Sequence, residues 1–242
     1  MINQFNIVKN LPNIMTLLNL LAGCFAIFFI LQDKFTYAIY CHFASLIFDF
    51  LDGFLARSLK SDSALGVQLD SLADMVSFGV APATIAVKLL AFSENVDLNS
   101  LNLTESFSML WVYVLAMSAG LRLGKFNIRT QTIKDFVGIP TPPMAMFFFG
   151  LLIIMQYGDM EMIMLLKHKW LIIFSVIYFT LMMNTNLIHF KLRPQKEFFT
   201  NPFVLAILGV SLALIIFNPV LVLSGSILAY TVLSIIANFV KI

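Results

Sequence analysis

Eight long, mostly apolar segments run through the chain, and they constrain its fold more than any other feature of the sequence. A helix needs about 20 consecutive apolar residues to cross the hydrocarbon core of a bilayer, and these segments are of that order. Only 12% of the residues are charged, whereas a soluble domain has about 25%. The sequence therefore predicts an integral membrane protein of the all-α class, built as a bundle of transmembrane helices.

The predicted helices form a single integral membrane domain over residues 1–242. Charge clusters and Pro or Asn turns separate them, at approximately 12–32, 36–59, 68–91, 107–127, 139–157, 169–190, 201–217 and 219–241. Six crossings are the minimum that this pattern supports, and eight is the number it favours. The last pair turns sharply at Asn218-Pro219, so one of its members could instead be tilted or partly re-entrant. The first nine residues form either a short interfacial helix or a disordered tail.

Lys and Arg gather at one end of the predicted helices. Cytoplasmic loops of membrane proteins carry an excess of these residues, so this end and both termini are predicted to be cytoplasmic, in a plasma or inner membrane. The eleven residues on this side are Lys9, Arg57, Lys60, Arg122, Lys125, Arg129, Lys134, Lys191, Arg193, Lys196 and Lys241. The four on the other side are Lys34, Lys88, Lys167 and Lys169. No Lys/Arg-rich run is long enough to predict nucleic-acid binding.

Four aspartates in the second and third predicted helices break the apolar pattern. A charge at bilayer depth costs about 3 kcal/mol or more, so such residues indicate function by default. Asp49 and Asp52 are three residues apart and Asp70 and Asp74 are four apart, which puts each pair on one face of a helix. The connection from Ser58 to Leu65 is short, so the two helices can lie antiparallel and bring both pairs to the cytoplasmic end.

The residue types around these aspartates indicate metal-dependent chemistry at phosphorus. Clustered carboxylates repel one another unless a cation compensates them, and Mg²⁺ or Mn²⁺ prefers oxygen ligands. Four Asp can hold two ions about 3.5–4 Å apart, the usual geometry for displacement at phosphorus. Gly53 and Gly66 leave space for a bulky substrate, Ala56 extends this small-residue face, and Arg57 suits a phosphate or pyrophosphate.

Three other interpretations of the aspartates stay open at this point. A single Asp near a helix end is as often a cap or an ion-pair partner. An ion or solute transporter also uses intramembrane Asp, and this alternative explains the carboxylates but not the Gly, Ala and Arg between them. A protein that merely binds lipid is a weaker alternative, because no position is missing from the pattern of Asp, Gly, Ala and Arg residues that is written out below.

The segment from Asp49 to Asp74 reads Asp-x-x-Asp-Gly-x-x-Ala-Arg, then eight residues, then Gly-x-x-x-Asp-x-x-x-Asp. In this pattern the chain resembles the CDP-alcohol phosphotransferase family. The resemblance implies an integral membrane enzyme with a six-helix catalytic core, here about residues 12–190, followed by an additional transmembrane pair at about 201–241. It also implies transfer of a phosphatidyl or similar group from a CDP-linked lipid to a hydroxyl acceptor, release of CMP, and a homodimer.

The resemblance also assigns roles to individual residues. Asp49, Asp52 and Asp70 are expected to hold one divalent ion, and Asp49, Asp70 and Asp74 a second, with Mg and Mn both open. Asp70 and Asp74 are the catalytic candidates, with Asp74 as general base for the acceptor hydroxyl. The expected contacts to CDP are Thr16, Asn19, Asp52, Gly53, Ala56, Arg57 and Gly66. Thr16 and Asn19 belong to the segment Pro12-Asn13-Ile-Met-Thr16-Leu-Leu-Asn19, and helix packing is their alternative role.

Three shorter segments resemble those members of the family that use serine as the acceptor. They are residues 77–82 (Ser-Phe-Gly-Val-Ala-Pro), 122–127 (Arg-Leu-Gly-Lys-Phe-Asn) and 138–142 (Gly-Ile-Pro-Thr-Pro). The implied substrates are CDP-diacylglycerol and L-serine, by direct attack or in two steps. Glycerol-3-phosphate or an inositol phosphate is the alternative acceptor, although these anions should require more cationic groups.

The expected acceptor contacts follow from the charges of serine. Its carboxylate needs a cation and its ammonium group needs oxygen atoms, and the candidates are Arg122, Lys125, Asn127, Pro140 and Thr141. Ordinary flanking charge is the alternative role of Arg122 and Lys125. Related enzymes often have Ala-Arg where this chain has Gly-Lys at 124–125, and Lys does not replace the planar fork of Arg. Pro140 and Pro142 either shape a loop over the site or start a helix.

Overall fold

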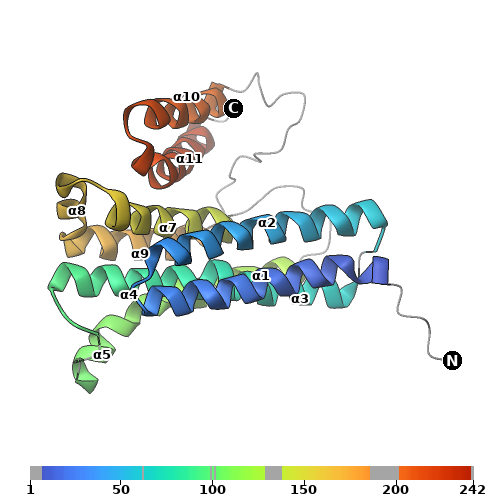
Figure 1. Ribbon diagram of the computed structural model, residues 1–242. Coiled ribbons are helices and arrows are strands. Elements are labelled where there is room, and N and C mark those ends of the chain that lie inside the picture. The colour runs from blue at the N-terminus through green and yellow to red at the C-terminus, as the bar shows by residue number, and fades with distance from the viewer. Residues whose placement is uncertain are drawn as a thin grey trace.

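The computed structural model describes residues 7–61, 63–98, 100, 102–128, 138–185 and 202–240. Within these residues every regular element is a helix, so the predicted all-α class is confirmed (Figure 1). The α-helices are α1 (Ile7–Leu31), α2 (Phe35–Leu59), α3 (Ala64–Asp74), α4 (Ala81–Glu94), α5 (Leu103–Leu110), α6 (Val114–Ile128), α7 (Thr141–Tyr157), α8 (Met160–Leu166), α9 (Lys169–Met183), α10 (Pro202–Phe217) and α11 (Val222–Val240). Short segments of other helical types join some of them: a π-helix (Met75–Val80) between α3 and α4, and 3₁₀ turns at Trp111–Tyr113 and Pro219–Leu221.

Five helical segments in the described residues are long and apolar enough to cross a membrane. They are Lys9–Leu31, Phe35–Leu59, Ala64–Glu94, Leu103–Ile128 and Pro219–Ile236. A sixth is obtained if α8 and α9, which meet at an angle of 63°, count as one broken span. α7 and α10 are apolar but shorter, with 17 and 16 residues. The chain is an integral membrane protein, whereas eight crossings and a six-helix core stay predictions.

The outer helices expose continuous apolar stripes. On α1 the stripe recurs every three or four residues, which is the repeat of one helix face. It consists of Ile14, Leu17, Leu21, Phe25 and Phe28, all of which are exposed. The corresponding residues of α2 are Tyr40, Phe43, Ile47, Phe50 and Phe54. Large side chains of this kind are suited to contact with lipid acyl chains rather than with water.

The interior of the bundle is packed around α4 and α7. Both helices are buried along most of their length, and large side chains from α4, α6, α7 and α9 meet there. The fully buried members include Leu89, Leu115, Phe148, Phe149 and Phe179. This packing holds the helices in one arrangement, so that residues near their ends have defined positions.

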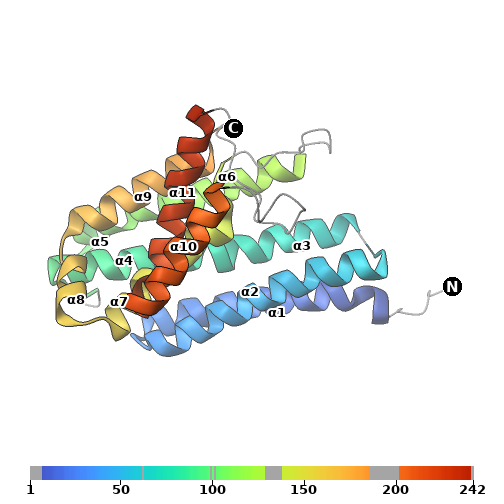
Figure 2. The same ribbon diagram turned by 90° about the horizontal axis from the view of Figure 1, so that it is seen from above.

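The last two long helices pack outside this bundle. α10 and α11 lie side by side (Figures 1 and 2), and α11 packs against α7. Gly150 of α7 allows this close approach, because a Cβ atom at this position would lie 2.7 Å from the backbone nitrogen of Ser224. The predicted C-terminal pair at 201–217 and 219–241 is therefore present as two helices.

Helix boundaries differ from the predicted ones where a capping residue extends a helix. The third helix begins at residue 64 instead of 68, because the Ser63 side chain accepts a hydrogen bond from Gly66 N at 3.0 Å. The connection before it is therefore shorter than Ser58 to Leu65. α8 was not predicted, and Asp159 caps it by accepting a hydrogen bond from Met162 N at 2.9 Å.

Four predicted segments lie partly outside the described residues, and for two of them, 201–217 and 219–241, only residues 201 and 241 are concerned. The helix predicted at 169–190 ends at Met183, and residues 186–190 are not among those described. Of the first nine residues, 1–6 lie outside as well, whereas 7–9 already belong to α1.

The described cations divide between the two ends of the bundle as predicted. One end holds the N-terminus of α1, the C-terminus of α2 and the N-terminus of α3, with Lys9, Arg57 and Lys60 (Figure 1). At the opposite end Lys88 pairs with Asp33 at 2.8 Å and Lys169 with Glu94 at 3.3 Å. Which end faces the cytoplasm stays a prediction. The predicted cytoplasmic residues Arg129, Lys134, Lys191, Arg193, Lys196 and Lys241 lie outside the described part.

Candidate active site

Three of the four predicted aspartates converge between α2 and α3. Asp49, Asp70 and Asp74 each offer one carboxylate oxygen, and these three atoms lie within 4.8 Å of one another. Asp74 is buried and the other two are partly buried. The Asp49 and Asp74 carboxylates are within hydrogen-bonding reach of each other. We call these three residues the acidic cluster.

The acidic cluster fits a divalent cation. Its donors are all oxygen atoms, which Mg²⁺ and Mn²⁺ prefer. Two oxygens on one Mg²⁺ are at most about 4.2 Å apart, so the cluster needs only small side-chain rotations to close on an ion. Asp74 Oδ1 is buried and has no hydrogen-bond partner among the described residues, which leaves it available as a ligand.

The fourth aspartate has a different environment. Asp52 is only 6% exposed, and its Oδ2 accepts a hydrogen bond of 2.6 Å from Thr16 Oγ1 of α1. It lies one helical turn from Asp49 but outside the acidic cluster. The predicted first metal site, which combines Asp49, Asp52 and Asp70, therefore stays a prediction.

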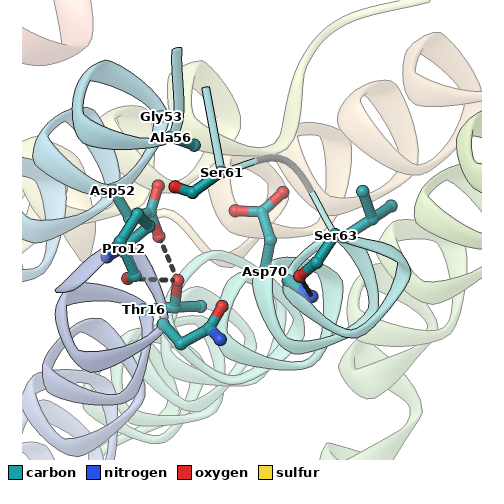
Figure 3. Close-up of a pocket in the computed structure, with 11 residues that line it drawn as sticks. Pro12, Thr16, Asp52, Gly53, Ala56, Ser61, Ser63 and Asp70 are labelled. Carbon is teal, nitrogen blue, oxygen red and sulfur yellow. Dashed lines mark hydrogen bonds between the residues drawn. The ribbon is translucent and has the colours of Figure 1, made fainter. Parts of the chain in front are cut away.

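A cavity adjoins these carboxylates between α1, α2 and α3 (Figure 3). It contains about 520 Å³ of space that no atom fills, part of which is open to solvent. Its lining residues are Pro12, Asn13, Thr16, Asp52, Gly53, Ala56, Ser61, Ser63, Gly66, Val67 and Asp70. Asp70 belongs to both the cavity wall and the acidic cluster, so a ligand in the cavity can reach the cluster.

Most of the predicted CDP contacts share this cavity. They are Thr16, Asp52, Gly53, Ala56 and Gly66, whereas Asn19 and Arg57 are not in its lining. Asp70 was predicted as a metal ligand, whereas sequence reasoning gave no site role to Pro12, Asn13, Ser61, Ser63 and Val67. Pro12 and Asn13 belong to the same first-helix segment as Thr16, which was a usable signal. Ser61 and Ser63 lie in the eight-residue gap of the motif, where no residue type is fixed.

The two motif glycines make room for polar side chains. A Cβ atom on Gly53 would lie 3.2 Å from Arg57 Nη1, so the guanidinium group of this exposed residue lies over the glycine. A Cβ atom on Gly66 would lie 3.2 Å from Asn13 Oδ1. The glycines thus allow an arginine and an asparagine to approach the helix backbone near the cavity.

Asn19 holds helices together. It is 0% exposed, and its Oδ1 accepts a hydrogen bond of 2.6 Å from Ser45 Oγ of α2. Its carbonyl oxygen accepts another, of 3.0 Å, from Ser77 Oγ in the π-helical segment. These contacts give Asn19 a helix-packing role, whereas its Nδ2 is buried and has no hydrogen-bond partner among the described residues, so the predicted contact with nucleotide stays a prediction.

The predicted acceptor residues on α6 have defined partners. Asn127 Nδ2 donates a 2.9 Å hydrogen bond to Ser71 Oγ, and Ser71 lies between the two aspartates of α3. Lys125 Nζ donates to Asn184 Oδ1 at 3.2 Å, and Asn184 Nδ2 donates to Ser118 Oγ at 2.7 Å. Asn184 follows α9 and had no predicted role. Asn127 is therefore the member of this set for which the structure shows a contact with α3.

Arg122 and the segment before α7 complete the predicted acceptor set. Arg122 is partly buried on α6 and interacts electrostatically with Tyr230 of α11. Pro140 is the residue before α7, and Thr141 is its buried first residue, so the prolines here start a helix. Ile139 N donates to Met182 O at 3.1 Å, which fixes this segment against the end of α9. A role of these residues in binding an acceptor stays a prediction.

Comparison with known proteins agrees with this arrangement. Residues 9–182 match the CDP-alcohol phosphatidyltransferase family, and the chain belongs to this family. This confirms the family predicted from the aspartate motif.

Several curated relatives carry the name CDP-diacylglycerol–serine O-phosphatidyltransferase. The Helicobacter pylori protein is 36% identical over 136 residues, which are 55% of this chain and 53% of the relative. The Bacillus subtilis protein is 32% identical over 132 residues, 54% of this chain and 69% of the relative. The Methanocaldococcus jannaschii protein is 32% identical over 149 residues, 61% of this chain and 63% of the relative. The chain thus spans about half the length of the Helicobacter pylori protein that it matches.

Proposed function

We propose that this chain transfers the phosphatidyl group of CDP-diacylglycerol to the hydroxyl of L-serine and so forms phosphatidylserine and CMP. The observation that carries the proposal is the acidic cluster beside a cavity that shares Asp70 with it. Family membership supports the reaction class, and the names of the relatives support serine as the acceptor. Neither observation favours an ion or solute transporter, or an anionic acceptor.

The aspartates divide between metal binding and donor binding. Asp49, Asp70 and Asp74 would hold divalent cations, and Asp52, fixed by Thr16, would face the donor in the cavity. We expect two divalent ions, Mg or Mn, to bind there. When bound, such ions offset negative charge on the phosphoryl oxygens and on the departing CMP.

The other steps of the proposed reaction depend on side chains of the protein. The serine hydroxyl attacks the phosphorus atom that carries the diacylglycerol, a new P–O bond forms, and the P–O bond to CMP breaks. Asp74 takes the hydroxyl proton through the carboxylate oxygen that does not bind a cation. Arg57, at the end of α2, is placed to offset phosphate charge.

The acceptor would enter from the end of the bundle where α6 meets α3. Asn127 forms a hydrogen bond with Ser71, the residue after Asp70, and Lys125 and Arg122 would supply positive charge for the serine carboxylate. We place this end, with both chain termini, in the cytoplasm on the basis of the Lys and Arg distribution. A homodimer is part of the same proposal.

The test is CMP release by the detergent-purified protein with CDP-diacylglycerol and a divalent metal. L-serine, glycerol-3-phosphate and inositol-1-phosphate are supplied in separate reactions. We expect release only with L-serine, loss of release with EDTA, and a decrease of roughly 1,000-fold or more in Asp70→Asn and Asp74→Asn. Glu161→Gln is the matched control, because Glu161 is an exposed residue of α8 at the opposite end of the bundle.

Each other outcome contradicts a defined part of the proposal. Release with a different acceptor would overturn serine and keep the reaction class. Release that survives EDTA would overturn the metal assignment. Full turnover by Asp74→Asn would overturn its role as the base, and absence of release with every acceptor would overturn the function as a whole.

A further inference from the structure

The turn between α2 and α3 folds back onto the last turn of α2. Lys60 has φ 48° and ψ 45°, a left-handed conformation that residues other than glycine rarely adopt. Ser61 N donates a hydrogen bond of 3.0 Å to Ala56 O, which closes a Schellman-type cap. Because Ala56 itself lines the cavity, this cap fixes Ser61 at the cavity wall.

The Ser61 hydroxyl points into the cavity. Figure 3 shows it in the space between the Asp52 and Asp70 side chains. Its Oγ is shielded from solvent, yet it has no hydrogen-bond partner among the described residues. A buried hydroxyl that lacks a partner is unfavourable, which indicates that a polar ligand in the cavity supplies one.

The other hydroxyl groups of the cavity are already engaged. Thr16 Oγ1 donates to Asp52 at 2.6 Å. Ser63 Oγ accepts from Gly66 N at 3.0 Å and caps α3. Of the three hydroxyl-bearing residues in the described lining, Ser61 is the one whose hydroxyl forms no hydrogen bond with another described residue.

We propose that Ser61 binds the nucleoside part of the CDP-linked donor through a hydrogen bond from its hydroxyl group. This inference rests on the proposed function. The diphosphate of the donor requires cations and is expected at the acidic cluster, whereas sugar hydroxyls and the base are neutral and form hydrogen bonds of the kind a serine provides. Ser61 lies in the motif gap, where the family pattern fixes no residue, so it would tune nucleotide affinity in this chain.

The experiment measures binding of CDP to the detergent-purified full-length protein with Mg²⁺, by calorimetry, and of pyrophosphate by competition. One hydrogen bond contributes about 0.5–1.5 kcal/mol, so Ser61→Ala should weaken CDP binding by about 2- to 12-fold. The affinity for pyrophosphate should not change, because pyrophosphate lacks the nucleoside. Ser58→Ala, an exposed serine in the last turn of α2, should bind both ligands as the wild type does.

A second variant tests whether CDP affinity depends on the Ser61 hydroxyl or on the conformation of the turn that carries it. Lys60→Gly should keep CDP affinity, because glycine adopts the left-handed conformation without strain and leaves Ser61 in place. A Lys60→Gly protein that binds CDP as weakly as Ser61→Ala would overturn the assignment, since the turn and not the hydroxyl would then be responsible.

The remaining outcomes distinguish this inference from the proposed function. Wild-type affinity for CDP in Ser61→Ala would overturn the assignment alone, and so would an equal loss of pyrophosphate affinity. A wild-type protein that does not bind CDP would overturn the proposed function, and this assignment with it.

Discussion

At the scale of single residues, the hydrogen bond between Thr16 and Asp52 connects the first helix to the motif. It is short, at 2.6 Å, and both residues are buried, which is typical of a hydroxyl that donates to a charged carboxylate. The bond fixes Asp52 on the cavity wall without any contribution from the acidic cluster.

Replacing this donor should weaken use of the nucleotide lipid. A hydrogen bond to a charged group contributes about 1.5–3 kcal/mol, so Thr16→Val should lower kcat/KM for CDP-diacylglycerol by roughly 10- to 150-fold. Thr16→Ser keeps the hydroxyl and should retain most of the activity. The measurement is the initial rate of CMP release against donor concentration. Equal kcat/KM in Thr16→Val and the wild type would contradict a role for this bond.

The family resemblance predicted Asp49, Asp70 and Asp74 as one set, and the structure brings these three carboxylates together, whereas helical spacing alone pairs only neighbours on one helix. Helical spacing puts Asp49 with Asp52 and Asp70 with Asp74, and both pairs do lie at one end of the bundle. The rotation of α2 against α3 decides which carboxylates meet across the helices, and it depends on packing along their whole length. For the same reason the sequence could not show that Asn19 turns inward to Ser45.

At the scale of helices, the π-helical segment Met75–Val80 begins directly after Asp74 and packs closely against α1. Such segments are rare and occur frequently at functional sites. Gly23 of α1 makes the approach possible, because a Cβ atom there would clash with the Ser77 hydroxyl and lie 2.9 Å from Ser77 Cα. The position of Asp74 therefore depends on a small residue on another helix.

A methyl group at this contact should separate α1 from the π-helical segment. Gly23→Ala is expected to destabilise the protein by about 1–3 kcal/mol, as overpacking does, and to lower the rate of CMP release. Gly124→Ala is the matched control, because a Cβ atom at Gly124 meets no atom within 4 Å. Thermal unfolding and turnover of the purified variants test this. Wild-type stability in Gly23→Ala would contradict the close contact.

The predicted helices agree with the structure where long apolar runs define them. They depart from it where local polar contacts determine where a helix begins or ends. α2 and α7 begin and end within two residues of the predicted limits, whereas α1 begins at residue 7 instead of 12. The seven-residue helix α8 was missed because its run is too short to span a membrane, although Asp159 is a recognisable N-cap signal. The π-helix leaves no periodic pattern in six residues, so the sequence could not reveal it.

At the scale of the whole molecule, the two ends of the bundle should face different compartments. Cys24 and Cys41 are first replaced by Ala, and Ser58→Cys or Ser100→Cys is introduced; both serines are exposed. Ser58 is in the last turn of α2 near the site, and Ser100 lies in the connection after α4. We expect a membrane-impermeant maleimide to label Ser100→Cys in intact spheroplasts, and Ser58→Cys only after permeabilisation.

The reverse labelling pattern would contradict the proposed orientation and leave the site geometry untouched. Labelling of both positions in intact spheroplasts would show that the label enters, so a cytoplasmic protein with a reactive cysteine serves as the internal control. Retention of CMP release by the variants confirms that the substitutions leave the fold intact.

The position of the cavity has a consequence for kinetics. It lies at one end of the bundle between α1, α2 and α3, and its lining residues Asn13 and Gly53 adjoin the exposed apolar residues Ile14 and Phe54. A two-chain lipid would therefore arrive by diffusion in the plane of the bilayer. Its effective concentration is then its mole fraction among the surrounding lipids, so adding inert detergent or lipid at constant total substrate should slow the reaction by dilution in two dimensions.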